Sequence, residues 1–116
     1  MGLDFNDTDR STRGDAATPT TAPLVIVARV QARPGAATQL VAAQAALVTA
    51  VRPQPGCLQY DLFEDEAQPG SVIFFERWRD RAAWEQHMRG AHMDAFRANA
   101  GPLIGDFDLL QMRQVA

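Results

Sequence analysis

Six hydrophobic patterns follow one another between residues 24 and 115, and their order limits the folds that the chain can adopt. Apolar residues that alternate with polar ones indicate strands, whereas apolar residues spaced three to four apart indicate helices. The patterns predict strands at 24–32, 57–64, 71–79 and 106–115, and helices at 36–52 and 81–89, with a shorter helical piece reaching about residue 99. The order β-α-β-β-α-β is that of the ferredoxin-like α+β fold, whose four-stranded antiparallel sheet carries its helices on one face.

Proline, glycine and aspartate mark the ends of these elements. Pro53-Gln54-Pro55-Gly56 stops the first helix, because proline lacks the backbone N–H that a helix needs. Asp80 precedes the second helix, where its carboxylate can accept a hydrogen bond from the first turn. Gly90 interrupts that helix, and Gly101-Pro102 ends the piece behind it. Two short helical pieces are therefore expected after the third strand.

Alternation within the strands assigns side chains to the two faces of the sheet. The strand at 71–79 divides into two sets, Val72, Phe74, Glu76 and Trp78 on one face and Ile73, Phe75 and Arg77 on the other. The first set contains the bulkier rings, so we expect it to face the helices. Leu58, Tyr60 and Leu62 of the preceding strand are expected on the same side.

The opposite face of the sheet is then unusually apolar. It carries Val25, Val27, Ile73 and Phe75. Soluble monomers rarely leave a large apolar patch in water, and twofold symmetric dimers are the commonest way of covering one. The sequence therefore predicts a homodimer through this face.

The composition fits one domain, residues 23–116, preceded by a tail. The chain has 116 residues, of which 47% are hydrophobic and 22% are charged. Residues 1–22 are polar and without periodicity, so we expect a flexible N-terminal tail. The formal charge of −3 indicates no surface for nucleic acid or an acidic membrane. Because no apolar run approaches the ~20 residues of a membrane span and no signal peptide is recognisable, we expect a cytoplasmic protein.

Several kinds of chemistry are disfavoured by the residues that the chain lacks. All 11 basic residues are arginine, so no lysine can form a Schiff base. Cys57 is the single cysteine and is expected to be a small half-buried apolar residue. His87 and His92 are five residues apart, which turns their rings about 140° from each other on a helix. No third ligand has a useful spacing, and we expect no metal site.

An acid, an imidazole and two indoles are concentrated around the junction of the third strand and the second helix. Glu76 is expected between the sheet and the helices, where a lone carboxylate is costly and either has a partner or has a raised pKa. Trp84, His87 and Met88 share one helix face, because they lie at i, i+3 and i+4. Core packing explains each of these residues singly, but Glu76, Trp78 and His87 together around one volume indicate a small-molecule site.

The chain resembles the antibiotic biosynthesis monooxygenase domains over about residues 24–115. The resemblance is carried by the first strand with Arg33-Pro34-Gly35, by Pro55-Gly56-Cys57 followed by Tyr60, and by Phe75-Glu76-Arg77-Trp78 followed by Trp84, His87, His92 and Phe96. Proteins of that family are dimeric α+β barrels. The family is functionally broad, and the resemblance implies oxidation of phenolic, quinol or polyketide-like molecules by O₂ without metal, flavin or haem.

The resemblance implies a role for each matching residue. His87 would be the proton acceptor, and Glu76 would orient or charge-balance its imidazole. Trp78 would form a wall of the pocket, and His92 and Tyr60 would be polar residues at its rim. Trp84, Met88 and Phe96 are further candidates for contact with an aromatic substrate. No cofactor is expected.

Three functions remain open at this point. The first is a cofactor-free monooxygenase acting on a small aromatic or quinol-like compound. The second is a non-catalytic ligand-binding or structural dimer module that uses the same pocket. The third is a metal-free isomerase in which Glu76 and His87 transfer protons without O₂.

Overall fold

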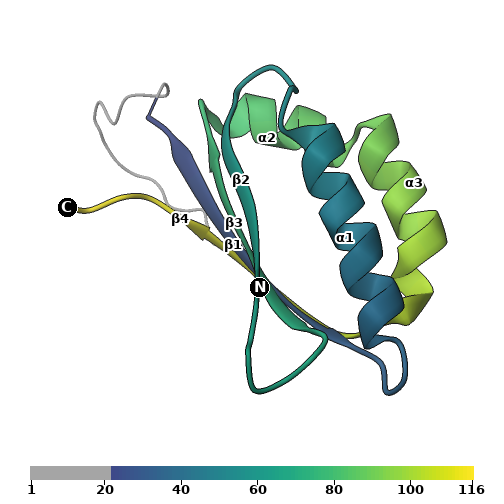
Figure 1. The fold of residues 1–116 in the computed structure, drawn as a ribbon. Coiled ribbons are helices and arrows are strands. Elements are labelled where there is room, and N and C mark those ends of the chain that lie inside the picture. Colours follow the sequence, from purple (N-terminus) through teal and green to yellow (C-terminus); the bar gives the residue numbers. More distant parts are fainter. Residues whose placement is uncertain (1–21) are drawn as a thin grey trace.

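The computed structural model describes residues 22–116 and confirms the predicted α+β architecture. Its elements are β1 (Leu24–Ala32), α1 (Ala37–Val51), β2 (Cys57–Glu64), β3 (Ser71–Trp78), α2 (Arg81–Met88), α3 (Ala91–Ala100), a 3-10 turn (Gly101–Leu103) and β4 (Ile104–Met112). The helices lie on one face of the sheet, with α1 and α3 packed side by side (Figure 1). The predicted tail falls on residues 1–22, of which 1–21 lie outside the described range.

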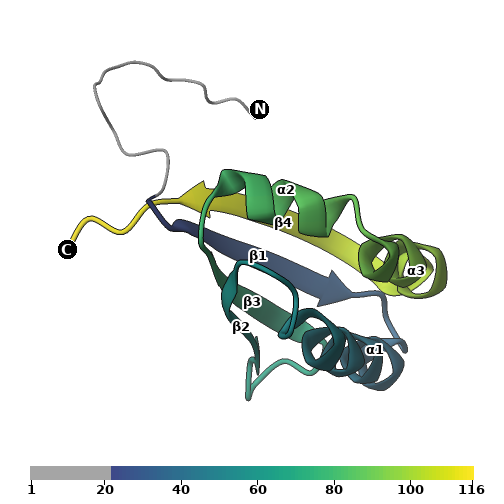
Figure 2. The ribbon, with the colours of Figure 1, turned by 90° about the horizontal axis from the view of Figure 1, so that it is seen from above.

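The four strands form one antiparallel sheet in the order β2-β3-β1-β4, which can be followed from one edge to the other in Figure 2. β1 and β3 occupy the centre, where each pairs on both sides. Glu76 lies opposite Ile26 of β1 and opposite Tyr60 of β2. The centre of the sheet therefore fixes the backbone of the residues on which the site depends.

The predicted division of β3 between the two faces is confirmed. Val72, Phe74, Glu76 and Trp78 are buried on the helix side, and Trp78 has no exposed surface. α1 contributes a buried apolar stripe to the same core, which includes Leu40, Leu47, Val48 and Val51. The core is the layer between sheet and helices, and the site lies inside it.

The prediction for Leu58 was wrong. Its side chain is 55% exposed, whereas Tyr60, two residues later, is 3% exposed. The register between β2 and β3 shifts between Cys57 and Gln59, so Leu58 occupies an irregularity in the strand. Such a bulge removes one residue from the alternation and turns its side chain out of the pattern.

The boundaries of the last strand were also wrong, because it spans Ile104–Met112 and not 106–115. Ile104 already pairs with Ala32, and the register shift next to this pair accommodates the extra residue. Met112 pairs with Val25, near the start of β1, so the residues after it have little of β1 left to pair with. The length of the neighbouring strand, not the local sequence, sets these limits.

The open face of the sheet carries large apolar side chains that are exposed to solvent. Phe63, Ile73, Leu110 and Met112 are 58%, 40%, 45% and 46% exposed. Ile73 pairs with Phe63 on one side and with Arg29 on the other, so these residues belong to one row across the sheet.

Within residues 22–116, no helix is both long and apolar enough to cross a membrane.

Candidate functional site

Four side chains from three elements meet in the layer between sheet and helices. Tyr60 comes from β2, Glu76 and Trp78 come from β3, and His87 comes from α2. Their exposed fractions are 3%, 5%, 0% and 4%. We call these four residues the central cluster.

The start of α2 places His87 over the sheet. The Asp80 carboxylate accepts a hydrogen bond from the backbone N–H of Ala83 at 2.9 Å, which confirms the predicted helix cap. His87 follows Ala83 by four residues, so both side chains are on the same face of α2, and both are buried. The cap fixes the start of α2, and this start determines that the helix face carrying Ala83 and His87 packs on the sheet.

The rings of the central cluster touch one another. The Trp78 and His87 rings are stacked, with centroids 4.7 Å apart and planes inclined by 22°. Tyr60 meets both edge-on, at 5.5 Å from His87 and 6.2 Å from Trp78. A substrate ring cannot lie between Trp78 and His87 unless the two first separate.

The hydrogen bonds differ from those predicted from the sequence. The Trp78 indole Nε1–H donates to Glu76 Oε1 at 2.8 Å. His87 Nδ1 lies 3.0 Å from Oε1 of Gln54, a residue of the turn between α1 and β2. The neighbour predicted to orient the imidazole was Glu76, but the structure gives that contact to Gln54.

Burial shifts the acid and the base in opposite directions. It raises the pKa of Glu76 to about 7, although the Trp78 N–H bond acts to lower it. Burial lowers the pKa of His87 to about 4, and the nearby charges of Arg97 and His92 lower it further. Burial also raises the pKa of Tyr60, with a smaller contribution from Glu76. At neutral pH the imidazole and the phenol are therefore uncharged, and Glu76 is close to half ionised.

These states define what the cluster can do chemically. A carboxyl group with a pKa near the ambient pH is well matched to accepting and returning protons. A neutral imidazole has one nitrogen that donates and one that accepts a hydrogen bond. The aromatic walls keep water away from both groups, which strengthens their electrostatic interactions.

The other predicted site residues lie at different distances from this cluster. Trp84 is buried on the same helix as His87, and Met88 and Phe96 are half-buried against the core. His92 is exposed on α3, so it is no part of the buried cluster, although its charge affects the pKa of His87. Among residues 22–116, no three His, Cys, Asp or Glu side chains are grouped to hold a metal ion.

Sequence reasoning missed two glutamines of this layer. Gln44 is fully buried on α1, and neither of its amide atoms has a hydrogen-bond partner; the Nε1 atom of Trp84 has none either. A pattern signal existed for Gln44, because it lies four residues after Leu40 and four before Val48 in the buried stripe. Gln54 gave no such signal, because it reaches His87 across 33 residues of sequence.

A hollow of about 570 Å³ lies elsewhere, along the open face of the sheet. Residues of the Phe63–Ile73–Arg29 row and of the β2–β3 turn line it, together with Asp106 and Asp108 of β4. None of the central cluster contributes to its lining. Its position suits contact with another molecule more than it suits the chemistry of Glu76 and His87.

Comparisons with known proteins agree with the fold and with the order of the motifs. A model of the antibiotic biosynthesis monooxygenase family matches residues 23–99. "Putative monooxygenase Rv0793" of Mycobacterium tuberculosis is 38% identical over 84 residues, which are 72% of this chain and 82% of the relative. "Putative monooxygenase YcnE" of Bacillus subtilis is 30% identical over 81 residues, or 70% of this chain and 85% of the relative.

Solved structures give the same result. The crystal structure of PA3566 from Pseudomonas aeruginosa superposes with a TM-score of 0.79 and 34% identity, covering 84% of this chain and 99% of that protein. The structure of Rv0793 gives a TM-score of 0.75 with 31% identity, covering 82% and 97%. The likeness extends over nearly all of the described residues.

Proposed function

Because the chain belongs to the antibiotic biosynthesis monooxygenase family, we propose that it is a cofactor-independent monooxygenase. Its substrate would be a small aromatic, quinol or polyketide-like compound, oxidised with O₂. The observation that carries the proposal is the buried pair of Glu76, with a pKa of about 7, and neutral His87 between aromatic walls. Two relatives carry the name "Putative monooxygenase", and in our proposal Glu76 and His87 supply the proton acceptor that such a reaction requires.

The residues have separate roles in this proposal. The Glu76 carboxylate removes a proton from the substrate, which leaves an electron-rich carbanion or phenolate. The neutral His87 ring accepts a hydrogen bond from the substrate hydroxyl, and Trp78 forms the wall against the aromatic ring. A quinol would become a hydroxyquinone, which contains one oxygen atom of O₂. The other oxygen atom leaves as water, together with the two hydrogens that the substrate loses. By excluding water, the protein protects the short-lived reduced oxygen species from side reactions.

Unpaired polar atoms in the same layer support a ligand there. Buried amide and indole N–H groups cost free energy when they lack a partner, about 1–3 kcal/mol each. The amide of Gln44 and the Nε1 atom of Trp84 are such groups. Oxygen atoms of a bound substrate would accept from the two N–H groups, and a substrate hydroxyl would donate to Gln44 Oε1, once the contact between Trp78 and His87 opens.

The same contact favours a second candidate. With the rings of Trp78 and His87 stacked at 4.7 Å, the cluster already resembles a packed core. A structural dimer module needs no further opening, whereas a ligand-binding module that uses this pocket would need the two rings to separate first. A metal-free isomerase would use the same Glu76 carboxyl, but it would turn over its substrate without consuming O₂.

Oxygen consumption distinguishes these functions. After exhaustive chelation, the protein is expected to accelerate O₂ uptake with a panel of quinols, and ¹⁸O₂ is expected to place one labelled atom in the product. A rate that disappears on chelation and returns with added metal would contradict the cofactor-free mechanism. Proton exchange of the substrate in the absence of O₂, without oxidation in its presence, would identify the isomerase.

The open face of the sheet supports a homodimer as the functional form. A second copy would cover Phe63, Ile73, Leu110 and Met112, which are 40–58% exposed in one chain. Arg29 and Asp108 face each other within the same surface at 3.9 Å, so the apolar rows are accompanied by charges of both signs. A twofold interface requires a self-complementary surface, and apolar rows beside charges of both signs meet this requirement.

Sedimentation at micromolar concentration is expected to give twice the mass of one chain. Ile73→Asp places a charge within the apolar rows and is expected to shift the protein to the monomer. Ala46→Asp adds the same charge to the exposed side of α1 and should leave the dimer intact. A wild-type protein that sediments as a monomer at these concentrations would contradict the dimer.

A further inference from the structure

The turn between α1 and β2 reaches across the molecule to the central cluster. Gln54 is half-buried, and its amide oxygen Oε1 lies 3.0 Å from Nδ1 of His87. An amide oxygen can only accept a hydrogen bond. The Nδ1 atom must therefore carry the hydrogen, and in a neutral ring the other nitrogen, Nε2, then carries none.

Hydrogen bonds within the turn hold Gln54 in place. Its backbone N–H donates to Val51 O at 2.8 Å, and its backbone oxygen accepts from Cys57 N at 3.1 Å. Pro53 and Pro55 on either side restrict the backbone further, because each ring fixes its own φ. The amide side chain thus starts from a rigid backbone.

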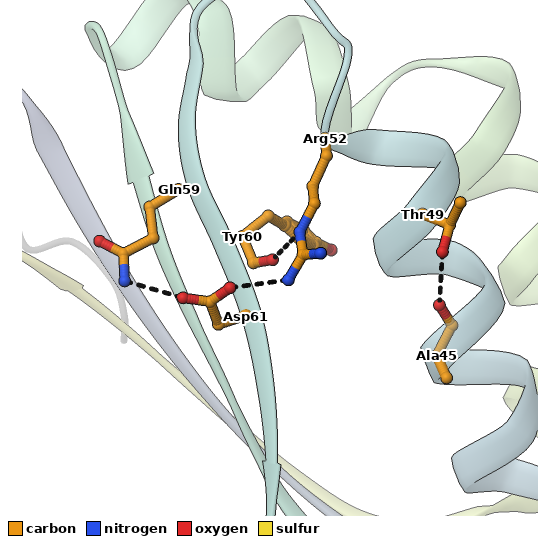
Figure 3. A network of polar contacts seen from close by, with 6 residues as sticks. All are labelled: Ala45, Thr49, Arg52, Gln59, Tyr60 and Asp61. Atoms are coloured by element: carbon orange, nitrogen blue, oxygen red, sulfur yellow. Dashed lines mark hydrogen bonds and ion pairs between the residues drawn. The ribbon is translucent and has the colours of Figure 1, made fainter.

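The start of the turn is tied to the sheet by Arg52, the residue that caps α1. Figure 3 shows its side chain extending to β2, where Nε donates to Tyr60 O at 3.0 Å and Nη2 to Asp61 Oδ1 at 2.8 Å. Gln59 donates to the other oxygen of Asp61, while Thr49 bonds back within the helix to Ala45 O. This anchor joins the turn to the strand that carries Tyr60.

The end of the turn is pressed against α2. Gly56 has a φ of +82°, and a Cβ atom at this position would lie 2.5 Å from the Cβ of Ala83. Its carbonyl oxygen accepts a hydrogen bond from Arg79 N at 2.8 Å. Ala83 and His87 are one helical turn apart on the same face. The turn therefore contacts α2 at two points, Gly56 at Ala83 and Gln54 at His87.

We propose that Gln54 is a positioning residue that holds His87 in the neutral Nδ1–H tautomer and presents a bare Nε2 as the acceptor for the substrate hydroxyl. Stacking on Trp78 fixes the plane of the ring, and the contact with Gln54 fixes its rotation within that plane. The catalytic part of this inference depends on the proposed monooxygenase function. The tautomer itself does not depend on it.

An uncharged partner suits a ring that must remain neutral. The ionisable groups around His87 are Tyr60 from β2, and His92 and Arg97 from α3. Glu76 of β3 bonds to the Trp78 indole that stacks on the ring. A carboxylate at position 54 would add a negative charge in direct contact with the ring and favour the imidazolium. The glutamine orients the ring without charging it.

The inference can be tested by ¹⁵N NMR of the two ring nitrogens in the intact protein at pH 7. The chain has 2 histidines, so His92→Asn leaves the resonances of His87 alone. We expect a protonated Nδ1 and an unprotonated Nε2. The opposite tautomer would overturn the inference, because it would require the amide of Gln54 to face the ring with its nitrogen.

Substitution of Gln54 adds a second readout. Gln54→Glu is expected to raise the pKa of His87 by about one to three units, whereas Gln86→Glu, with the same added charge on the exposed side of α2, is expected to change it much less. Equal shifts of the His87 pKa in the two variants would contradict a direct contact between Gln54 and His87 in solution.

A third variant separates the inference from the proposed function. Gln54→Leu removes the acceptor without adding charge, so it is expected to disturb the tautomer. We expect quinol turnover to fall about 10–100-fold, the size of effect that the orienting partners of metal-binding histidines have. If wild-type NMR shows the Nδ1–H tautomer and no oxidation is found with any quinol, the proposed function fails while the tautomer assignment stands. If oxidation is found and Gln54→Leu leaves its rate unchanged, the positioning role fails while the function stands.

Discussion

Replacing Glu76 by glutamine is expected to lower quinol turnover by about 10²–10⁴-fold, the usual contribution of a general base. The amide keeps an oxygen to accept the Trp78 N–H bond, so the packing is preserved while the proton acceptor is removed. In the proposed mechanism, the base of the wild-type protein is the ionised form of Glu76, whose pKa is about 7. The rate should therefore rise with pH through about 7 and level off above it.

The pH profile also decides between the two candidate bases. His87 has a pKa of about 4, so it is neutral across the range in which Glu76 titrates. If His87 removed the proton, the rate would rise near pH 4 instead. His87→Ala is expected to reduce turnover by removing the hydrogen-bond acceptor, with the midpoint near 7 retained. Glu85→Gln makes the same substitution on the exposed side of α2 and should leave both rate and profile unchanged.

Local sequence patterns were sufficient for most of the architecture. The period of apolar residues is a property of neighbouring positions, and it located every helix and strand of the described range within about two or three residues. Strand alternation correctly placed Glu76 and Trp78 on the helix side, and the face of α2 correctly supplied His87. The sequence could predict that these residues lie together, because the face on which each side chain lies depends only on its own strand or helix.

The remaining features depend on contacts between elements. Leu58 left the alternation because the register between β2 and β3 shifts beside it, and β4 ends near the start of β1, where little of β1 is left to pair with. The hydrogen bond of His87 is made with Gln54, because the turn that carries Gln54 docks on α2. Neither pairing is encoded in the period of a single segment.

The pKa values were likewise beyond the sequence. A carboxylate in the core was expected to have either a partner or a raised pKa, and the structure shows both, since Trp78 donates to it while burial raises its pKa to about 7. The two effects oppose each other. Only the depth of burial decides which one is larger.

Truncation of Trp78 is expected to have the largest effect on stability. The side chain has no exposed surface and stacks on His87, so Trp78→Ala should lower the free energy of unfolding by about 3–5 kcal/mol. Urea titration measures the loss. Trp84→Ala, which truncates a second buried indole outside the stack, provides the comparison for burial alone.

Trp78→Phe tests the hydrogen bond separately from the packing, because it keeps an aromatic ring and removes the indole N–H that donates to Glu76. Glu76 has a folded-state pKa of about 7 against an ordinary value of 4.5, so its protonated form stabilises the fold below pH 4.5 and this contribution, about 3 kcal/mol, is lost as the pH rises through 7. His87 acts in the opposite direction between about pH 4 and 6.5, and it contributes no further change above that range.

The informative window for this variant is therefore pH 6.5 to 9. Without the indole N–H, the pKa of Glu76 should rise further, because that bond favours the carboxylate. Trp78→Phe should accordingly lose more stability across this window than the wild type does, and its rate profile should move to higher pH. Adding Glu76→Gln should abolish the difference, because the double variant has no carboxyl group left to ionise. A Trp78→Phe protein that is destabilised equally at both ends of the window would show that the indole acts on Glu76 through packing alone.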